Sequence, residues 1–349
     1  AQLYRNRGDG TFEDVAAQAG VENRRLAKGV AWADVDGDRF PDLYVSNLNG
    51  DNRLYRNRRD GTFEDIAPAA GVTRPWSSLA VAVLDFDNDG RVDLFVGATA
   101  PRHGTEVVGN RSDELAPLSG AVALALGDSA AAKSVETSRL YRGLGGGRFE
   151  DVTEAQGLGR AVLTGGIGVG DLDADGFTDL YLGKVYPGFE GLLPNKLYRN
   201  RGGAGFADVT TAAGMGHLQK AGGLAVADLD GDGDEDVLVN AGGMYRGDTF
   251  GDLLFSNPGN GNHWLEIRLV GRRSNRAGVG VRVRARVTEG GGTRWIEGTA
   301  GAGGSFGANP RTVRLGLGRA AVVDELQVYW PASDRRQELR QVAADRTIE

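Results

Sequence analysis

The chain has 349 residues, a formal net charge of −7, 56 glycines and no cysteine. The lack of cysteine excludes disulfides, thiolate metal sites and cysteine nucleophiles, and no apolar run approaches the ~20 residues that a membrane-spanning helix needs. The glycines are spread along the chain without the three-residue period of collagen, which favours many short strands joined by tight turns.

A first repeated phrase, Leu-Tyr-Arg-Asn or a close variant, runs through residues 1–257. Each of its first four copies leads into a Gly-rich turn and then a short segment that begins with Phe, as expected for two strands joined by a tight turn. The copies lie at residues 3–6, 54–57, 140–143 and 197–200, with a weaker one at 254–257.

A second, aspartate-rich phrase alternates with the first and begins at Asp34, Asp85, Asp171 and Asp228. The intervals are 51, 86 and 57 residues, so the long one holds a repeat plus an insertion of about thirty residues, between about 98 and 138. Each unit reads strand, aspartate loop, strand, strand, turn, strand. Four strands in this period predict the blade of a β-propeller rather than a helical solenoid.

The four aspartate loops share one arrangement, with acids at positions 1, 3, 5 and 9. Four carboxylates within nine residues repel one another unless a cation lies among them. Calcium takes six to eight oxygen ligands in a flexible geometry, so the loops predict up to four Ca²⁺ sites. The predicted side-chain ligands are Asp34, Asp36, Asp38, Asp42, Asp85, Asp87, Asp89, Asp93, Asp171, Asp173, Asp175, Asp179, Asp228, Asp230, Asp232 and Asp236.

Position 7 of each loop is predicted to offer its backbone carbonyl to the ion; it is Phe40, Arg91, Phe177 or Asp234. Position 6 is glycine in three loops, where a sharp turn needs a positive φ, but it is Arg39 in the first. We therefore expect the first site to be strained or weak.

An EF-hand shares the first half of this pattern, but it needs a Glu at position 12 and flanking helices. Position 12 is Val45, Val96, Leu182 or Val239 here, with β-type flanks, which excludes the EF-hand. Solvated acidic turns without any metal are the remaining alternative. Four such turns in register make that alternative weak.

The size of the calcium effect bears on where the protein works. At millimolar calcium and a dissociation constant on the order of 10 μM, each site adds roughly 2.7 kcal/mol to stability. Four sites together rival the stability of a typical domain, about 5–15 kcal/mol. Resting cytosolic calcium would leave such sites largely empty, so we predict an extracellular, cell-surface or periplasmic protein.

A second domain is predicted at residues 258–349, after a propeller at residues 1–257. The phrases stop there, and residues 281–287 alternate between apolar and arginine, as in a strand with one buried and one exposed face. The propeller carries a net charge of −13 and the second domain +6. Arg282, Arg284 and Arg286 either bind an anionic partner such as an acidic polysaccharide or form a solvated strand face; we favour the second interpretation.

The aspartate loops resemble the FG-GAP/VCBS repeats of integrin α-chain propellers and of many bacterial surface proteins. The tail is similar to the ASPIC/UnbV domain of the cartilage acidic protein family, through residues 261–265, 274–280, 315–318 and 328–331. These resemblances imply an all-β, secreted, calcium-binding protein without catalytic residues, whose partners are proteins or components of the cell surface and matrix.

The resemblance also implies about seven blades, whereas four aspartate loops are present. Either residues 3–16 close a smaller ring against the last blade, or further blades precede them. The expected fold is a propeller of four-stranded blades followed by a small β-sandwich-like domain.

Other candidate sites are weaker. The insertion is the preferred site of partner contact, because long loops in compact domains are usually functional or disordered, and residues 186–189 are a second candidate. The Arg-Gly-Asp tripeptide at 246–248 occurs easily by chance, the sequon at Asn110 matters only in a eukaryote, and His103, His217 and His263 are too dispersed for a shared site.

The leading functional hypothesis is a calcium-stabilised extracellular binding or adhesion module that recognises a protein or an anionic glycan through loops on the propeller faces. A polysaccharide-active enzyme is the rival, and it needs two acids outside the calcium loops in one cleft. A surface-layer or filament component that self-associates is the third hypothesis. We expect no nucleic-acid partner and no membrane span.

Overall fold

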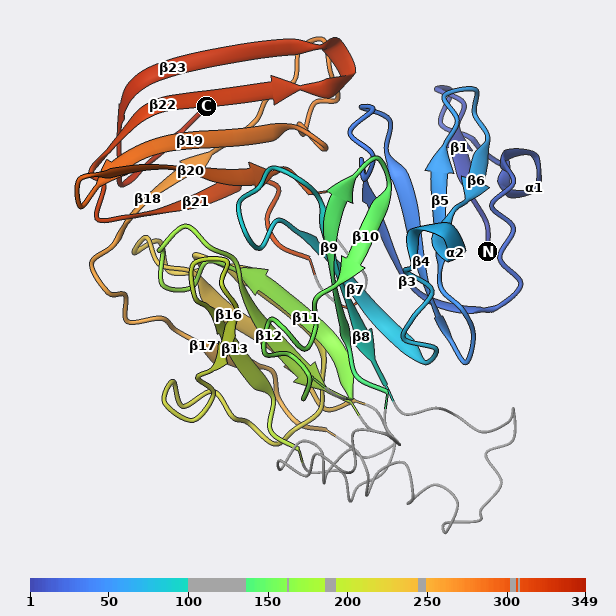
Figure 1. Cartoon of the computed structure of the whole chain (residues 1–349), viewed down its shortest axis with the longest axis horizontal. Helices are drawn as coiled ribbons and strands as arrows, with labels where there is room; N and C mark the ends of the chain where they lie inside the picture. Colours follow the sequence, from blue (N-terminus) through green and yellow to red (C-terminus); the bar gives the residue numbers. More distant parts are fainter. Residues whose placement is uncertain (100–135, 162, 186–192, 244–248, 302–305, 307) are drawn as a thin grey trace.

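A computed structural model describes residues 1–99, 136–161, 163–185, 193–243, 249–301, 306 and 308–349. These residues form an all-β protein in which antiparallel sheets follow one another along the chain and the C-terminal sheets lie at one end (Figure 1). None of the helices within these ranges is long and apolar enough to cross a membrane.

Three complete blades each contain four antiparallel strands paired in chain order. This pairing confirms the predicted order of strand, aspartate loop, strand, strand, turn and strand. The blades are β3 (Leu26–Ala33), β4 (Asp42–Leu48), β5 (Arg53–Asn57) and β6 (Phe63–Asp65); β7 (Ser78–Leu84), β8 (Asp93–Ala98), β9 (Arg139–Gly145) and β10 (Arg148–Asp151); and β11 (Thr164–Gly170), β12 (Asp179–Lys184), β13 (Lys196–Asn200) and β14 (Phe206–Asp208).

Among its described residues the fourth blade has three strands, not the four expected: β15 (Ala221–Ala227), β16 (Asp236–Ala241) and β17 (Leu253–Phe255). Its copy of the first phrase is Leu-Phe-Ser-Asn, and Pro258 follows directly instead of a Gly-rich turn and a Phe segment. The chain therefore leaves the blade after its third strand.

The blades pack face to face, with β3 against β7, β7 against β11 and β11 against β15. Because both faces of a blade contact a neighbour, β8 is buried at every position and reads as an apolar run. Separate apolar clusters fill each junction: Leu54 and Val81 belong to the first, Phe86 and Leu180 to the second.

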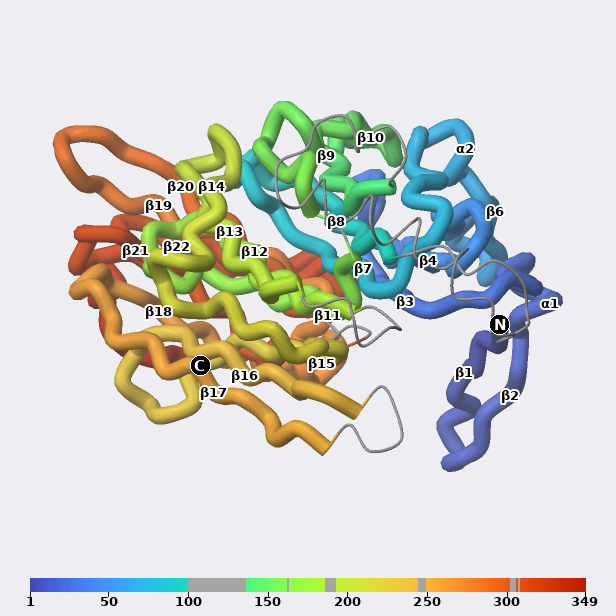
Figure 2. The backbone as a smooth tube through the Cα atoms, turned by 90° about the horizontal axis from the view of Figure 1, so that it is seen from below, coloured from blue at the N-terminus to red at the C-terminus, as the bar shows by residue number. Residues whose placement is uncertain are grey.

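The N-terminal hairpin, β1 (Tyr4–Asn6) and β2 (Phe12–Asp14), is a separate two-stranded sheet followed by the one-turn helix α1 (Ala16–Ala19); a second short helix, α2 (Ala67–Ala70), follows β6. Among the described strands the hairpin pairs with none of the fourth blade, and Figure 2 shows it apart from β15–β17. Tyr4 is 55% exposed, against 4% for Tyr55 at the same place in the first blade. The hairpin therefore does not close a small ring in this structure.

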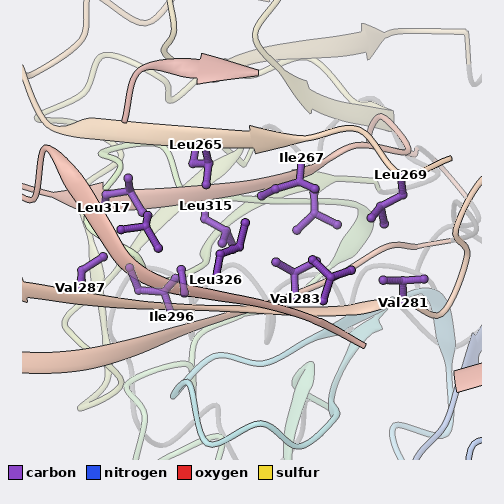
Figure 3. Close-up of a cluster of buried hydrophobic side chains, with 14 of the residues drawn as sticks. Leu265, Ile267, Leu269, Val281, Val283, Val287, Ile296, Leu315, Leu317 and Leu326 are labelled. Carbon is purple, nitrogen blue, oxygen red and sulfur yellow. The ribbon is translucent and has the colours of Figure 1, made fainter. Parts of the chain in front are cut away.

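The C-terminal region is a sandwich of two sheets. One has the order β21 (Val313–Gly318), β18 (His263–Ile267) and β24 (Arg346–Ile348); the other has β20 (Gly292–Thr299), β19 (Arg282–Glu289), β22 (Val322–Trp330) and β23 (Arg335–Ala343), with a 3-10 turn at Pro331–Ser333. Their facing side chains, including Leu265, Val283 and Leu315, form one apolar core (Figure 3). The alternation predicted for residues 281–287 is confirmed, with Val281, Val283, Ala285 and Val287 buried.

Candidate metal centres

Each aspartate loop joins the first two strands of its blade, so the four loops lie at the same end of their blades. In every loop three carboxylates bring one oxygen each within 4.8 Å of the others. The groups use positions 1, 3 and 9 in the first three loops and positions 1, 3 and 5 in the last. They are Asp34, Asp36 and Asp42; Asp85, Asp87 and Asp93; Asp171, Asp173 and Asp179; and Asp228, Asp230 and Asp232.

Of the predicted side-chain ligands, Asp38, Asp89, Asp175 and Asp236 lie outside these tight groups among the described residues. In all four loops the position-5 carboxylate accepts a hydrogen bond from the position-7 backbone N–H, as from Phe177 to Asp175 at 3.0 Å. One oxygen of the position-5 aspartate therefore shapes the turn that contains the predicted carbonyl ligand.

The carboxylate of the first aspartate in each loop accepts hydrogen bonds from backbone N–H groups later in the same loop, so the backbone turns around it. Asp171 accepts from the N–H of Asp175 at 2.9 Å through Oδ1 and from the N–H of Gly176 at 2.7 Å through Oδ2. Gly176 has φ 94°, and Arg39 at the same place in the first loop has φ 80°. Arg39 thus adopts the left-handed turn despite its Cβ, which strains the first loop, as its sequence predicted.

The last aspartate of each loop is almost fully buried, and its two oxygens accept two backbone hydrogen bonds. Asp179 accepts from Leu172 at 3.1 Å and from Asn200, at the end of the third strand, at 2.7 Å. Asn57, Gly143 and Asn257 make the second bond in the other blades. The final residue of the Leu-Tyr-Arg-Asn phrase is thus part of each centre, a role that the repeat signalled but the sequence analysis missed.

The asparagine side chain also ties neighbouring loops together. Asn200 donates through Nδ2 to the carbonyl of Phe86, in the preceding loop, at 2.8 Å, and Asn257 donates to Leu172 at 2.7 Å. The second blade has Gly143 instead, where an added Cβ would collide with the carbonyl oxygen of Val92. Steric exclusion therefore explains why this copy of the phrase lacks its Asn.

Burial penalises the ionised form of the clustered carboxylates, and neighbouring carboxylates add to this penalty. Burial raises the pKa of Asp93 to about 8 and those of Asp42 and Asp85 to about 7. Burial and then the neighbouring carboxylates raise the pKa of Asp171 well above its ordinary value, and burial does the same for Asp179. A cation among these oxygens relieves the penalty, because an opposite charge favours the ionised form.

Two buried carboxylate oxygens show where a metal ion fits. Asp87 Oδ1 in the second loop and Asp173 Oδ1 in the third have no hydrogen-bond partner among the described residues. Leaving a buried acceptor unsatisfied is costly, and a hard cation such as Ca²⁺ takes oxygen ligands of this kind. The donor set of these two loops therefore fits a hard divalent cation.

Arginines lie beside all four loops: Arg91 pairs with Asp89 in the second, and Arg199 pairs with Asp173 and Asp175 in the third. The Arg282 guanidinium is 2.7 Å from Asp34 Oδ2, Arg59 is 2.8 Å from Asp38, and Arg314 is 3.6 Å from Asp228. Part of the negative charge of these loops is already compensated by the protein.

The three arginines of β19 are half-exposed, which agrees with the favoured interpretation of a solvated strand face, and each lies beside a carboxylate. Arg282 pairs with Asp34, Arg284 lies 3.6 Å from Glu297 and 3.8 Å from the Trp295 ring centroid, and Arg286 is 3.1 Å from Glu325. The alternating sequence predicted which face of the strand these arginines occupy. The carboxylates that pair with them come from other segments of the chain.

Some of the weaker candidate sites lie within the residues that the structure describes, and the others lie outside them. His217 packs on Phe250, and His263 lies 2.7 Å from Asp345, so these two histidines form no joint site. His103, Asn110, nearly all of the insertion, residues 186–189 and the Arg-Gly-Asp tripeptide at 246–248 lie outside the described residues.

Comparisons with known proteins agree with this architecture. Residues 1–45, 34–96 and 191–239 match the FG-GAP-like repeat, and residues 271–349 match the ASPIC and UnbV family. The third loop lies outside the matched ranges, yet it has the same hydrogen bonds as the second. The chain is therefore an FG-GAP-type β-propeller protein with a C-terminal ASPIC/UnbV domain.

Its curated relatives are proteins named Cartilage acidic protein 1. The chain is 41% identical to the human protein, 39% to that of Mus musculus and 36% to that of Xenopus tropicalis, each over 93 residues. The alignments cover 26% of this chain and 14% of each relative. The resemblance to the cartilage acidic protein family is confirmed.

Proposed function

We propose that the chain is a calcium-stabilised extracellular binding module and not an enzyme. The observation that carries the proposal is a cluster of three carboxylates in each of the four loops, two of which bury an oxygen without a donor. Each ion would be held by the aspartates of one loop together with the position-7 carbonyl. When bound, it supplies positive charge that holds the first two strands of a blade together at their ends.

An extracellular setting follows from the expected affinity. Sites with dissociation constants on the order of 10 μM fill at millimolar calcium and stay largely empty in a resting cytosol. The FG-GAP-like repeats and the ASPIC and UnbV match support this assignment, and the relatives are named for cartilage.

The C-terminal domain offers a candidate site for an anionic partner. A groove of about 490 Å³ has Arg268, Arg272, Arg273 and Arg335 in its lining, beside apolar residues that include Trp330. Within the described part of the chain these four arginines form no ion pair. We therefore place recognition of a sulfated or carboxylated polysaccharide in this groove.

Recognition through propeller-face loops stays a prediction, since the insertion lies almost entirely outside the described residues. The enzyme hypothesis finds no support in the groove, where Glu349 is the sole acidic lining residue and no second acid completes a pair. Self-association into a surface layer or filament also stays a prediction.

Thermal unfolding with and without a calcium chelator, combined with metal counting, tests the calcium proposal. We expect up to four ions per chain and, with all four bound, an unfolding midpoint that falls by roughly 20–40 °C on chelation, since each site adds about 2.7 kcal/mol and 1 kcal/mol shifts a domain of this size by ~2–4 °C. Added calcium should restore the midpoint. An unchanged midpoint with no bound ion contradicts the proposal.

Heparin, a sulfated polysaccharide, is a suitable probe for the groove. We expect the double variant Arg272→Ala/Arg273→Ala to elute from a heparin column at lower salt than the unmodified chain, because each lost cation removes an anion contact. Arg7→Ala/Arg24→Ala removes the same charge from exposed arginines of the propeller and is the matched control. Equal elution of the two variants contradicts a site in the groove.

A further inference from the structure

The C-terminal domain contacts all four aspartate loops. At the first loop, Arg282 reaches Asp34, and Asp334 lies 3.0 Å from Arg39. At the second loop, the N–H of Glu297 donates to Asn88 Oδ1 at 3.0 Å. These three contacts bring two strands and a turn of the domain onto the ends of the first two blades.

The third and fourth loops are held through their backbone. The carbonyl of Ala174 accepts from the N–H of Gly318 at 2.9 Å, and the carbonyl of Asp173 accepts from Asn262 Nδ2 at 2.7 Å. In the fourth loop the Arg314 guanidinium bonds the carbonyl of Gly233. The acceptors are therefore carbonyl oxygens whose direction depends on how each loop is curled.

Gly316 of the Leu-Gly-Leu-Gly motif lies directly against the third loop. A Cβ at this position would meet the backbone Cα and carbonyl carbon of Ala174 at 2.6 and 2.5 Å, and Asp171 Oδ2 even more closely. Gly316 has no positive φ, so space is what demands glycine there. Since the atoms that exclude a side chain belong to the loop, docking explains this part of the domain's own motif.

Charge favours the same contact. The propeller is acidic and the C-terminal domain basic, with net charges of −13 and +6. Arg282 and Arg314 each contact Oδ2 of the first aspartate in a loop, namely Asp34 and Asp228. Complementary charges of this kind fix the register of an interface.

We propose that the C-terminal domain is a docking partner for the metal-loaded loops, so that calcium binding and domain docking strengthen each other. The inference rests on the proposed calcium loading. Without an ion, carboxylate repulsion opens the loops and moves the carbonyls and outer oxygens on which the domain docks. By linkage, a docked domain must raise calcium affinity by the same factor by which calcium favours docking.

Gly316→Ala should push the domain off the third loop while leaving every loop residue in place, with Gly292→Ala as the matched control. Gly292 lies in the same domain, and a Cβ there meets nothing closer than 3.8 Å. Calcium titration calorimetry measures affinity, and small-angle scattering with and without chelator measures the radius of gyration. We expect the unmodified chain and the control to expand on chelation. We expect Gly316→Ala to be expanded already in calcium and to bind at least one ion about 5-fold more weakly.

The double variant Arg282→Ala/Arg314→Ala provides a second test should Gly316→Ala fail to fold. It should expand the chain in calcium, whereas Arg340→Ala, which removes an exposed arginine, should not. The radius alone is the readout for this variant, because removing two cations from beside Asp34 and Asp228 itself favours a bound cation. If calcium binds and stabilises the chain but neither chelation nor these variants change the radius or the affinity, the coupling is refuted and the calcium proposal stands. If no calcium binds, the calcium proposal and the coupling are both refuted.

Discussion

The propeller and the C-terminal sandwich are both built from antiparallel sheets, but they are stabilised in different ways. The sandwich has one continuous apolar core between its sheets. The propeller divides its apolar residues among separate clusters at the blade junctions and buries Asp42, Asp93 and Asp179 at the ends of its strands. In the proposal above, a bound ion at these buried carboxylates would supply the cohesion of the blade ends.

The largest difference should appear when pH is varied in chelator. The pKa of Asp93 is raised to about 8 and that of Asp85 to about 7, so the folded propeller binds more protons than the unfolded chain above about pH 4. This contribution to stability is fully present below the unfolded pKa and is lost as pH rises through the folded values.

We therefore expect the metal-free propeller to unfold at a lower temperature at about pH 8 than at about pH 5.5, while the sandwich changes little. Scanning calorimetry across this range measures both transitions. In calcium the propeller trend should weaken or reverse, because the ion displaces the protons and gains affinity as pH rises. A metal-free propeller that becomes more stable towards pH 8 contradicts the burial of these carboxylates.

Leu265→Ala should produce the next largest effect, in the sandwich alone. Leu265 is fully buried in the core of Figure 3, and truncating a buried leucine costs about 2–5 kcal/mol. Denaturant unfolding should show the loss in calcium and in chelator alike. A loss of stability that depends on calcium would contradict the view that the sandwich, unlike the propeller, is stabilised by its apolar core alone.

Asp87→Asn should produce a somewhat smaller effect that depends wholly on calcium. It removes the charge of the carboxylate whose buried oxygen lacks a partner, so one ion and roughly 2.7 kcal/mol of propeller stability are lost in calcium. In chelator the variant should be at least as stable as the unmodified chain, because repulsion among the loop acids decreases.

Asp51→Asn is the matched control, since Asp51 is exposed and lies outside the aspartate loops. Metal counting on both variants completes the test. A loss of stability for Asp87→Asn that is the same with and without calcium would point to a packing role for this side chain.

The sequence alone predicted the repeated parts of the fold. Phrases recurring in register predicted the four-stranded blades, the loop aspartates and the turn at position 6, because each depends on residues close together in the chain. Calcium as the bound ion and the domain boundary near residue 257 stay predictions.

Contacts between segments far apart in the chain could not be predicted from the sequence. Alternation placed Arg282 on the exposed face of a strand, but nothing local indicated that Asp34 would meet that face 248 residues away. The same holds for Gly316, whose neighbour is the third loop. In the fourth blade the sequence has only a weak copy of the first phrase. The described part of this blade has no fourth strand, because no turn and Phe segment follow that copy.

Gly143 makes one seam of the propeller unlike the others. At the seams between the second and third blades and between the third and fourth, an asparagine amide clamps one loop to the next. The first seam has glycine there and, among the described residues, no equivalent clamp. At the loop end of the blades, local opening should therefore be easiest between the first two blades, where the amide protons of the loops should exchange with solvent sooner than at the other two seams.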